Sequence, residues 1–298
     1  MATKYWTGGA GTGLIATAGN WSDAAAPAAG DTLVFRDNAV DVAPGQNSSG
    51  DTFAKVVFDA SYTGKVASPR SPWVVAASIV EIGSYAGIGT ASHSGSINLD
   101  TTNVASVVNV YATADESSVD EDRPPVYIKA NENTTVVNIF AGNVAINDIP
   151  DGTTATVATV NVGYLSASTG SANVSIGASV TLTTLNVRSG TVTMRGIGTN
   201  ITQYGGELTL DTTDSFSNVT VYGGTFNGDA FNTITNFAIT GVTSVQAIAD
   251  FLRTSNARTI TNFSLGKNVA RLDIDTNNVT VTNKVDPLYP LTITASRV

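Results

Sequence analysis

Three stretches decide the fold: LNVRSGTVTM (185–194), ITQYGGELTL (201–210) and VTVYGGTFNG (219–228). Each opens with an apolar–polar–apolar segment (weaker at 201–203, where the third residue is Gln203), passes through a bend that contains glycine, and continues with a second alternating segment. The bend glycines align at Gly190, Gly206 and Gly224. Alternation with a period of two residues is typical of strands with one face turned inward, and glycine suits sharp bends. Each stretch therefore predicts a strand, a tight bend and a second strand.

The same pattern extends over most of the chain. One set of segments lies at 80–82, 108–110, 137–139, 160–162 and 185–187, and continues less clearly at 201–203, 219–221, 237–239 and 263–265. Their starts are 28, 29, 23, 25, 16, 18, 18 and 26 residues apart. A second set lies between them, at 97–99, 126–128, 144–146, 174–176, 192–194 and 208–210. The period is irregular, but it stays within the range of solenoid repeats.

Strands of three to five residues cannot each bury a core alone, whereas stacked coils share one. We therefore predict an all-β fold, a right-handed parallel β-helix (solenoid). About nine coils at a spacing of ~4.8 Å would form a rod roughly 40 Å long. A β-sandwich also has short strands separated by turns. The recurrence of outward asparagines at 109, 138, 161 and 186 favours the solenoid, because a sandwich gives no reason for it.

The ends and insertions complete the predicted organisation. Residues 1–54 do not fit the repeat, and Trp6, Trp21 and Phe35 suggest an N-terminal cap and attachment region. An open solenoid end exposes unpaired strand edges, so a cap is expected there. The solenoid is assigned to 55–284 and an extended C-terminal arm to 285–298, where Pro287 and Pro290 exclude a helix.

Two insertions interrupt the strands. The segment 112–125 (ATADESSVDEDRPP) is acidic and ends in two prolines, which predicts an exposed loop. In 243–252 (TSVQAIADFL), Val245, Ile248, Ala249 and Leu252 follow helical spacing, with Thr243 or Ser244 as the N-cap. We therefore predict one short inserted helix.

Composition excludes several classes of protein. The 298 residues are 42% hydrophobic and 13% charged, with a net charge of −9, so disorder is not expected. Residues 1–148 carry −8 of this charge and 149–298 carry −1, which is not a nucleic-acid footprint. The chain has no cysteine, no apolar run of membrane-spanning length and no signal-peptide pattern at its start. We therefore expect a soluble protein with no nucleic-acid or membrane partner.

The search for chemistry gives weak candidates, and we predict no catalytic, cofactor or metal site. The single histidine, His93, lies in a small polar loop without a G-x-S-x-G motif. The acidic run 115–122 could ligate calcium, but it lacks the EF-hand order. Paired carboxylates could hydrolyse glycans; the candidates are Glu81, Glu132, Glu207, Asp211 and Asp273. A possible docking patch for an acidic partner comprises Arg253, Arg258, Lys267 and Arg271.

The opening of the chain resembles an N-terminal pattern of bacteriophage structural proteins. The matching features are Trp6, Gly8-Gly9, Asn20-Trp21-Ser22, Pro27 and GDTLVF at 30–35. Similar repeats occur in bacterial autotransporter passengers, which also carry a signal peptide and a membrane barrel. The resemblance covers roughly residues 5–36, about a tenth of the chain.

The resemblance implies a virion protein, commonly a homotrimer, and the lack of a catalytic set leads us to expect that it is non-enzymatic. Because one solenoid nearly fills the chain, we expect a capsid decoration or cement protein. It would be made in the host cytoplasm, lie on the capsid exterior and bind the major capsid protein. The alternatives are a receptor-binding tail fibre or adhesin and, second, a glycan depolymerase. Tyr204 and Tyr222, one coil apart, would offer part of a flat side for packing of the trimer.

Overall fold

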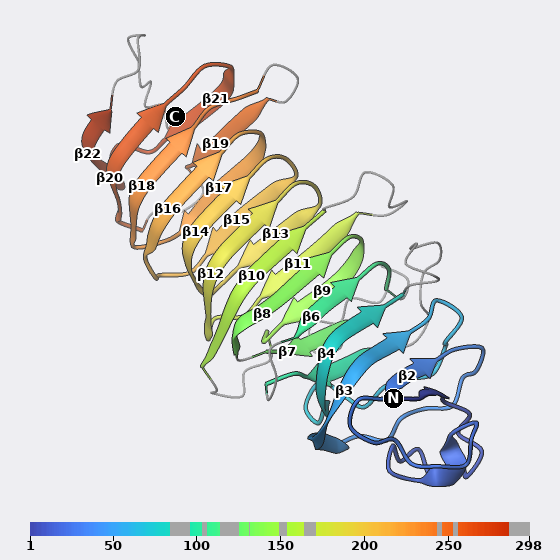
Figure 1. Cartoon of the computed structure of the whole chain (residues 1–298). Helices are drawn as coiled ribbons and strands as arrows, with labels where there is room; N and C mark the ends of the chain where they lie inside the picture. The colour runs from blue at the N-terminus through green and yellow to red at the C-terminus, as the bar shows by residue number, and fades with distance from the viewer. Residues whose placement is uncertain are drawn as a thin grey trace.

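A computed structural model describes residues 1–83, 96–102, 106–113, 125–130, 132–148, 154–163, 171–242, 246–252 and 256–285. The chain forms a rod of stacked coils, with the N-terminus near one end and the last strands at the other (Figure 1). A short 3-10 turn, η1 (Ala18–Asn20), is the helical element of the described residues, and the other elements are strands.

The strands form two rows along the rod. Row A contains β1 (Thr3–Tyr5), β2 (Thr32–Phe35), β3 (Asn47–Phe58), β4 (Trp73–Ile82), β6 (Val107–Val110), β8 (Glu132–Ile139), β10 (Ala155–Val162), β12 (Val180–Val187), β14 (Ile197–Gln203), β16 (Phe216–Val221), β18 (Thr233–Ile239), β20 (Arg258–Leu265) and β22 (Val279–Val285). Row B contains β5 (Ile97–Asp100), β7 (Val126–Lys129), β9 (Gly142–Ile146), β11 (Ala172–Ile176), β13 (Thr191–Met194), β15 (Glu207–Asp211), β17 (Gly224–Ala230), β19 (Ala247–Phe251) and β21 (Val269–Ile274). The long strand β4 pairs with both β5 and β6 and so joins the rows.

The parallel β-helix predicted from the sequence is confirmed. The pairings between the named strands are parallel, and each coil pairs with the coils before and after it. The first set of segments stacks in row A with the predicted correspondence, from 80–82 on 108–110 to 237–239 on 263–265. The second set stacks in row B in the same way.

The core is one continuous column of apolar side chains. Within row A, a stack of buried residues runs Ile82, Val110, Ile139, Val162 and Val187. A single buried cluster includes these residues and extends from Trp6 to Val279. Because inward residues of successive coils touch along the whole rod, each coil completes the core of its neighbours.

The predicted helix in 243–252 is wrong. Ala247–Phe251 is the strand β19, which pairs with β17 and β21. Ala247, Ala249 and Phe251 are fully buried, as a period of two requires. A segment between two coils gains backbone hydrogen bonds on both sides, and this tertiary pairing overrides a short helical pattern. Residues 243–245 lie outside the described residues.

The predicted cap region contributes to the same rod. Residues 1–54 supply β1, β2 and most of β3, so row A runs through this region without a break. Most of the acidic segment (114–124) and of the C-terminal arm (286–298) lies outside the described residues.

Candidate interaction surfaces

The tryptophan–glycine–asparagine pattern builds a closed cap at the N-terminal end. Trp6, Trp21 and Phe35 pack with ring centroids 5.2–5.7 Å apart. The Trp6 indole N–H donates to the Val40 carbonyl at 3.0 Å, and the Trp21 indole N–H donates to the Ile15 carbonyl at 2.8 Å. The cap therefore satisfies its buried polar groups while it covers the end of the core.

Asn20 organises the loop of the cap. Its side-chain amide donates to Thr12 Oγ1 and to the Leu14 carbonyl, both at 2.9 Å. Its side-chain oxygen accepts the Ala10 N–H at 3.0 Å, and its backbone carbonyl accepts the Thr7 N–H at 2.8 Å. One fully buried asparagine thus fixes the loop that precedes it, which explains its position beside Trp21 in the motif.

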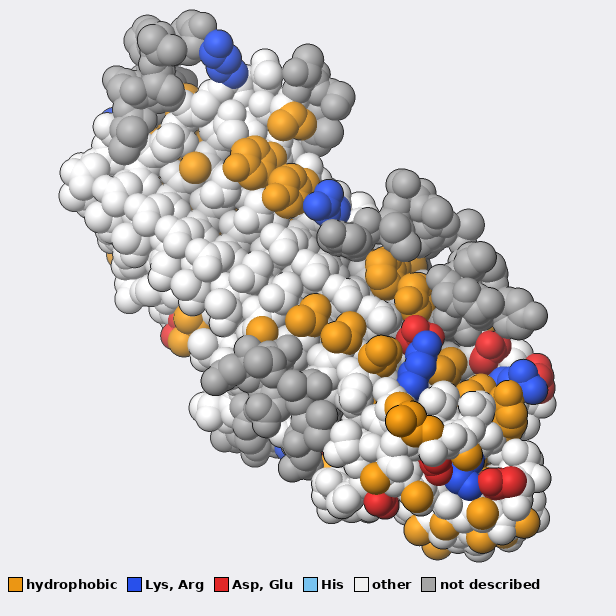
Figure 2. Space-filling view, in the orientation of Figure 1, with side chains coloured by type: hydrophobic (Ala, Val, Ile, Leu, Met, Phe, Trp, Pro, Cys, Tyr) orange, Lys and Arg blue, Asp and Glu red, His pale blue; other side chains and the backbone are white. Residues whose placement is uncertain are grey.

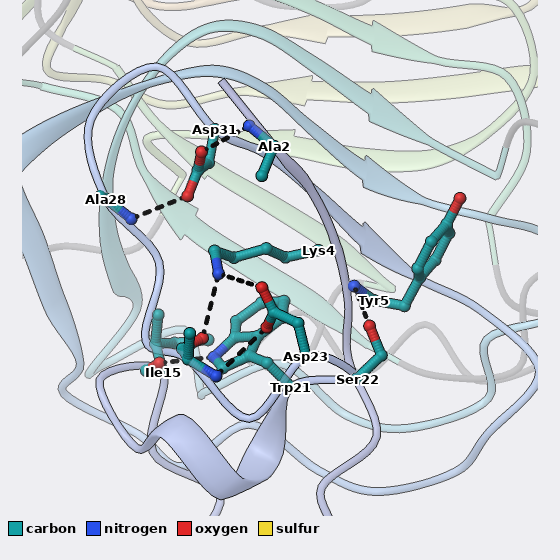
Figure 3. A network of polar contacts seen from close by, with 10 residues as sticks. Ala2, Lys4, Tyr5, Ile15, Trp21, Ser22, Asp23, Ala28 and Asp31 are labelled. Atoms are coloured by element: carbon teal, nitrogen blue, oxygen red, sulfur yellow. Dashed lines mark hydrogen bonds and ion pairs between the residues drawn. The ribbon is translucent and has the colours of Figure 1, made fainter.

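Two carboxylates hold the first strand against the cap (Figure 3). The buried Lys4 ammonium donates to Asp23 at 2.6 Å and to the Ala25 carbonyl at 3.2 Å. Asp31 accepts the Ala2 N–H at 2.8 Å and the Ala28 N–H at 3.1 Å. The hydrogen bond from Lys4 lowers the pKa of Asp23, and the bond from Ala2 lowers the pKa of Asp31.

These contacts predict an acid-sensitive cap. The folded state holds the pKa of Asp31 below its ordinary value of 3.8, so the ionised group stabilises the fold above that pH. This stabilisation is lost as the pH falls through the lowered pKa. We expect Asp31→Asn to flatten the dependence of unfolding free energy on pH below about pH 5, measured by urea unfolding with tryptophan fluorescence. The exposed Asp51 in β3 supplies the matched control, Asp51→Asn; an equal flattening there would contradict the assignment.

Asparagine ladders run along the outward side of row A. The predicted outward asparagines are hydrogen bonded in series, side-chain amide to side-chain oxygen: Asn138 to Asn109 at 2.8 Å, Asn161 to Asn138 at 2.8 Å and Asn186 to Asn161 at 2.9 Å. A second ladder, which the sequence analysis missed, continues toward the C-terminal end at 2.8–3.0 Å through Asn200, Asn218, Asn236, Asn262 and Asn283. Each rung holds its neighbours in one rotamer, so this side of the rod is rigid.

The outward side of row A carries almost no charge. The strands β6, β10, β12, β14, β16 and β18 contain no Asp, Glu, Lys or Arg. We call their outward side chains the uncharged face; they are mostly Thr, Ser, Asn and Ala. In Figure 2 the middle of the rod, over the row A strands, shows almost no red or blue.

An aromatic ridge borders the uncharged face. It consists of Tyr111, Phe140, Arg188, Tyr204 and Tyr222. Each follows the last residue of a row A segment and donates its backbone N–H to the preceding coil, at 2.7–2.9 Å. Tyr111 stacks on Phe140 with centroids 4.7 Å apart, and Tyr204 stacks on Tyr222 at 5.3 Å. The Arg188 guanidinium lies 4.9 Å from the Tyr204 ring centroid. The ridge therefore includes the tyrosine pair predicted from the sequence.

Row B carries two clusters of paired charges. Arg195 donates to Asp148 at 2.8 Å and lies 3.6 Å from Asp211. Arg271 contacts Asp273 at 2.7 Å and Asp250 at 3.8 Å. The strands β9, β11 and β13 of row B also contain no charged residue, so the two rows differ mainly in these ion-paired clusters.

The candidate glycosidase carboxylates do not converge. Glu81 pairs with Lys55 at 2.8 Å on row A. Glu207 accepts the Asn227 amide at 2.7 Å; it and Asp211 lie at opposite ends of β15, about 13 Å apart along the strand. Asp273 lies in β21, three coils further on. The side chain of Glu132 is outside the described part of the chain.

One carboxylate pair brought together by the fold was missed. Asp250 and Asp273 are register partners in β19 and β21, and Arg271 lies against both. The sequence prediction placed Asp250 in a helix, so it could not pair Asp250 with Asp273 across neighbouring strands. The arginine makes the pair an ion-paired surface cluster.

The remaining candidates either lie outside the described residues or do not form the predicted patch. His93, Arg253 and the acidic run 115–122 lie outside the described residues. The basic patch is not formed as expected, because Arg258 is 2% exposed and Arg271 is ion-paired. Among the described residues, no group of three or more His, Cys, Asp and Glu side chains could hold a metal ion.

Comparison with known proteins gives no relative. No family model, no curated protein and no solved structure matches the chain. Among the described residues, no helix has the length and apolar character needed to cross a membrane.

Proposed function

We propose that this chain is a non-enzymatic structural protein of a bacteriophage virion, a decoration or cement protein on the capsid exterior. The observation that carries the proposal is the cap. The segment that resembles phage structural proteins folds into a compact unit at one end of the rod, organised by Trp6, Asn20 and Trp21. A cap of this kind leaves the rest of the rod free to project from a particle.

The cap also offers a surface suited to attachment to the major capsid protein. Leu14 is 40% exposed, and small apolar residues of the same region are exposed at positions 10, 16, 24–26, 28 and 29. Figure 2 shows hydrophobic side chains spread over this end of the rod. Exposed apolar surface of this kind is typical of protein contact sites. We propose that the cap contacts the capsid and that the protein is a homotrimer.

Location on the particle tests this role. We expect immunogold labelling or cryo-electron microscopy of the phage to place the protein over the capsid lattice. Purified protein should also rebind particles that lack it, and Leu14→Asp should reduce that binding roughly tenfold or more. Val242→Asp, far from the cap and 45% exposed, serves as the matched control. Location at the tail tip would replace the proposal with a receptor-binding fibre or adhesin.

The non-enzymatic part of the proposal has its own test. A depolymerase would release reducing sugar from host capsule, and Asp250→Asn or Asp273→Asn, in the carboxylate pair that the fold brings together, would abolish the release. We expect no release by the wild-type protein. Sugar release that is lost in either variant would overturn the non-enzymatic role.

A further inference from the structure

One stretch of the rod is free of charged residues although the chain as a whole is acidic. The net charge is −9, yet six row A strands contain no charged residue. On row B the strands β9, β11 and β13 are also uncharged, but Asp148, Arg195 and Asp211 form a charged cluster at the strand ends, and Arg271 joins two further aspartates. Copies of an acidic protein repel each other, and the repulsion is weakest where they meet through an uncharged side.

The uncharged face is also pre-organised for contact. The ladder bonds fix the asparagine side chains in series at 2.8–3.0 Å. The threonines between them are β-branched and have few rotamers. Docking on this face therefore costs little side-chain entropy, which otherwise opposes association.

The aromatic ridge supplies residues that dominate protein interfaces. Tyrosine and arginine are enriched among the side chains with the largest effects on binding. Tyr204 is 40% exposed, and Arg188 beside it is exposed as well. At the other end of the face, the register partners Ile79 and Val107 are each 37% exposed. The face is thus bordered by anchoring side chains along its length.

We infer that the uncharged face and the aromatic ridge form the surface on which a second copy of this chain docks, with the two rods side by side. From β6 to β18 the uncharged face spans about 29 Å at ~4.8 Å per strand. With a width of roughly 15–20 Å, it offers ~430–580 Å² per copy, which corresponds to the smaller class of protein interfaces. The inference assigns a surface to the self-association in the proposed function, and it does not depend on attachment to a capsid.

The mass of the protein in solution tests this surface. We expect light scattering and sedimentation of the full chain at micromolar concentration to give a dimer or trimer. Thr202→Glu places a charge in the middle of the uncharged face and should weaken association roughly tenfold or more. Tyr204→Ala should weaken it in the same direction, because it removes an anchor from the ridge.

The matched control is Thr193→Glu in β13. Thr193 is half-buried and outward like Thr202, but it belongs to row B. We expect this variant to keep the wild-type mass, and circular dichroism should show that all three variants fold. Wild-type protein that is monomeric at ~100 μM, or equal dissociation by Thr193→Glu, would overturn the inference. Neither result bears on where the protein sits on a particle, so the two proposals fail separately.

Discussion

Replacing Arg258 by methionine should lower the free energy of unfolding by about 3–5 kcal/mol. Arg258 is 2% exposed, at the start of β20. Its guanidinium donates to the carbonyls of Gly228 and Phe251, the latter at 2.7 Å, and its Nε donates to the Asn256 carbonyl at 3.2 Å. Burial lowers the pKa of Arg258, and nearby carboxylates, Asp275 first among them, oppose the shift.

We expect a large effect because methionine leaves buried backbone carbonyls without a hydrogen-bond donor. Its side chain fills much of the same space but donates no hydrogen bond, so carbonyls from separate coils lose their donor inside the rod. A buried acceptor without a partner costs more than the net worth of the original bond. Arg258 thus fastens β17, β19 and β20 together, and its loss should loosen the C-terminal coils.

Urea unfolding followed by circular dichroism measures the effect. Arg271→Met is the matched control, because the Arg271 side chain is 57% exposed and its ion pairs lie at the surface. We expect that control to change the unfolding free energy by less than about 1 kcal/mol. Equal losses in the two variants would show that Arg258 contributes nothing beyond an ordinary surface charge.

The stacking of the coils could be predicted from the sequence because inward positions carry a repeated signal. The apolar–polar–apolar segments recur at the positions that the register requires, even where the coil length changes from 29 to 16 residues. The variable part of each coil falls in the bends and loops. The signal in the strands therefore survives the irregular period.

The second asparagine ladder was not predicted from the sequence, although it follows the same alternation. The central residue of each segment at this end of the chain is not an asparagine, as Thr202 and Thr220 show. The residue before each segment, Asn200 or Asn218, also faces outward because alternation continues past the segment. Asparagines that recur at the coil spacings would have revealed the ladder.

Side chains that bond to distant backbone atoms could not be placed from the sequence. Arg258 looked like part of a basic patch because its partners, Gly228 and Phe251, are identified only by the fold. Gln203 is a second side chain whose backbone partners are identified only by the fold. It occupies an inward position in the row A stack, where its amide donates to the Gly206 carbonyl at 3.1 Å and the Thr225 carbonyl at 2.9 Å.

Gly206→Ala is expected to cost about 3–5 kcal/mol, much more than a usual Gly→Ala change. Gly206 has a φ of +70°, in the left-handed region that side chains disfavour. A Cβ there would lie 2.4 Å from the Gly190 carbonyl oxygen and 2.9 Å from the Ser189 carbonyl carbon. Both obstacles are backbone atoms of the preceding coil, so relief requires the coils to separate.

A substitution at Gly11 separates the cost of the positive φ from the cost of the steric clash with the preceding coil. Gly11 has a φ of +66°, but a Cβ there would meet nothing within 4 Å. Gly11→Ala should therefore cost only the conformational part, about 1–2 kcal/mol. The difference between the two variants, from urea unfolding, measures how closely the bends pack on one another. Equal costs would mean that the coils can part at the bend without loss. A larger cost at Gly206 would explain why glycine also stands at positions 190 and 224, where the φ values are +85° and +81° and a Cβ would come within 2.2 Å of a carbonyl oxygen of the preceding coil.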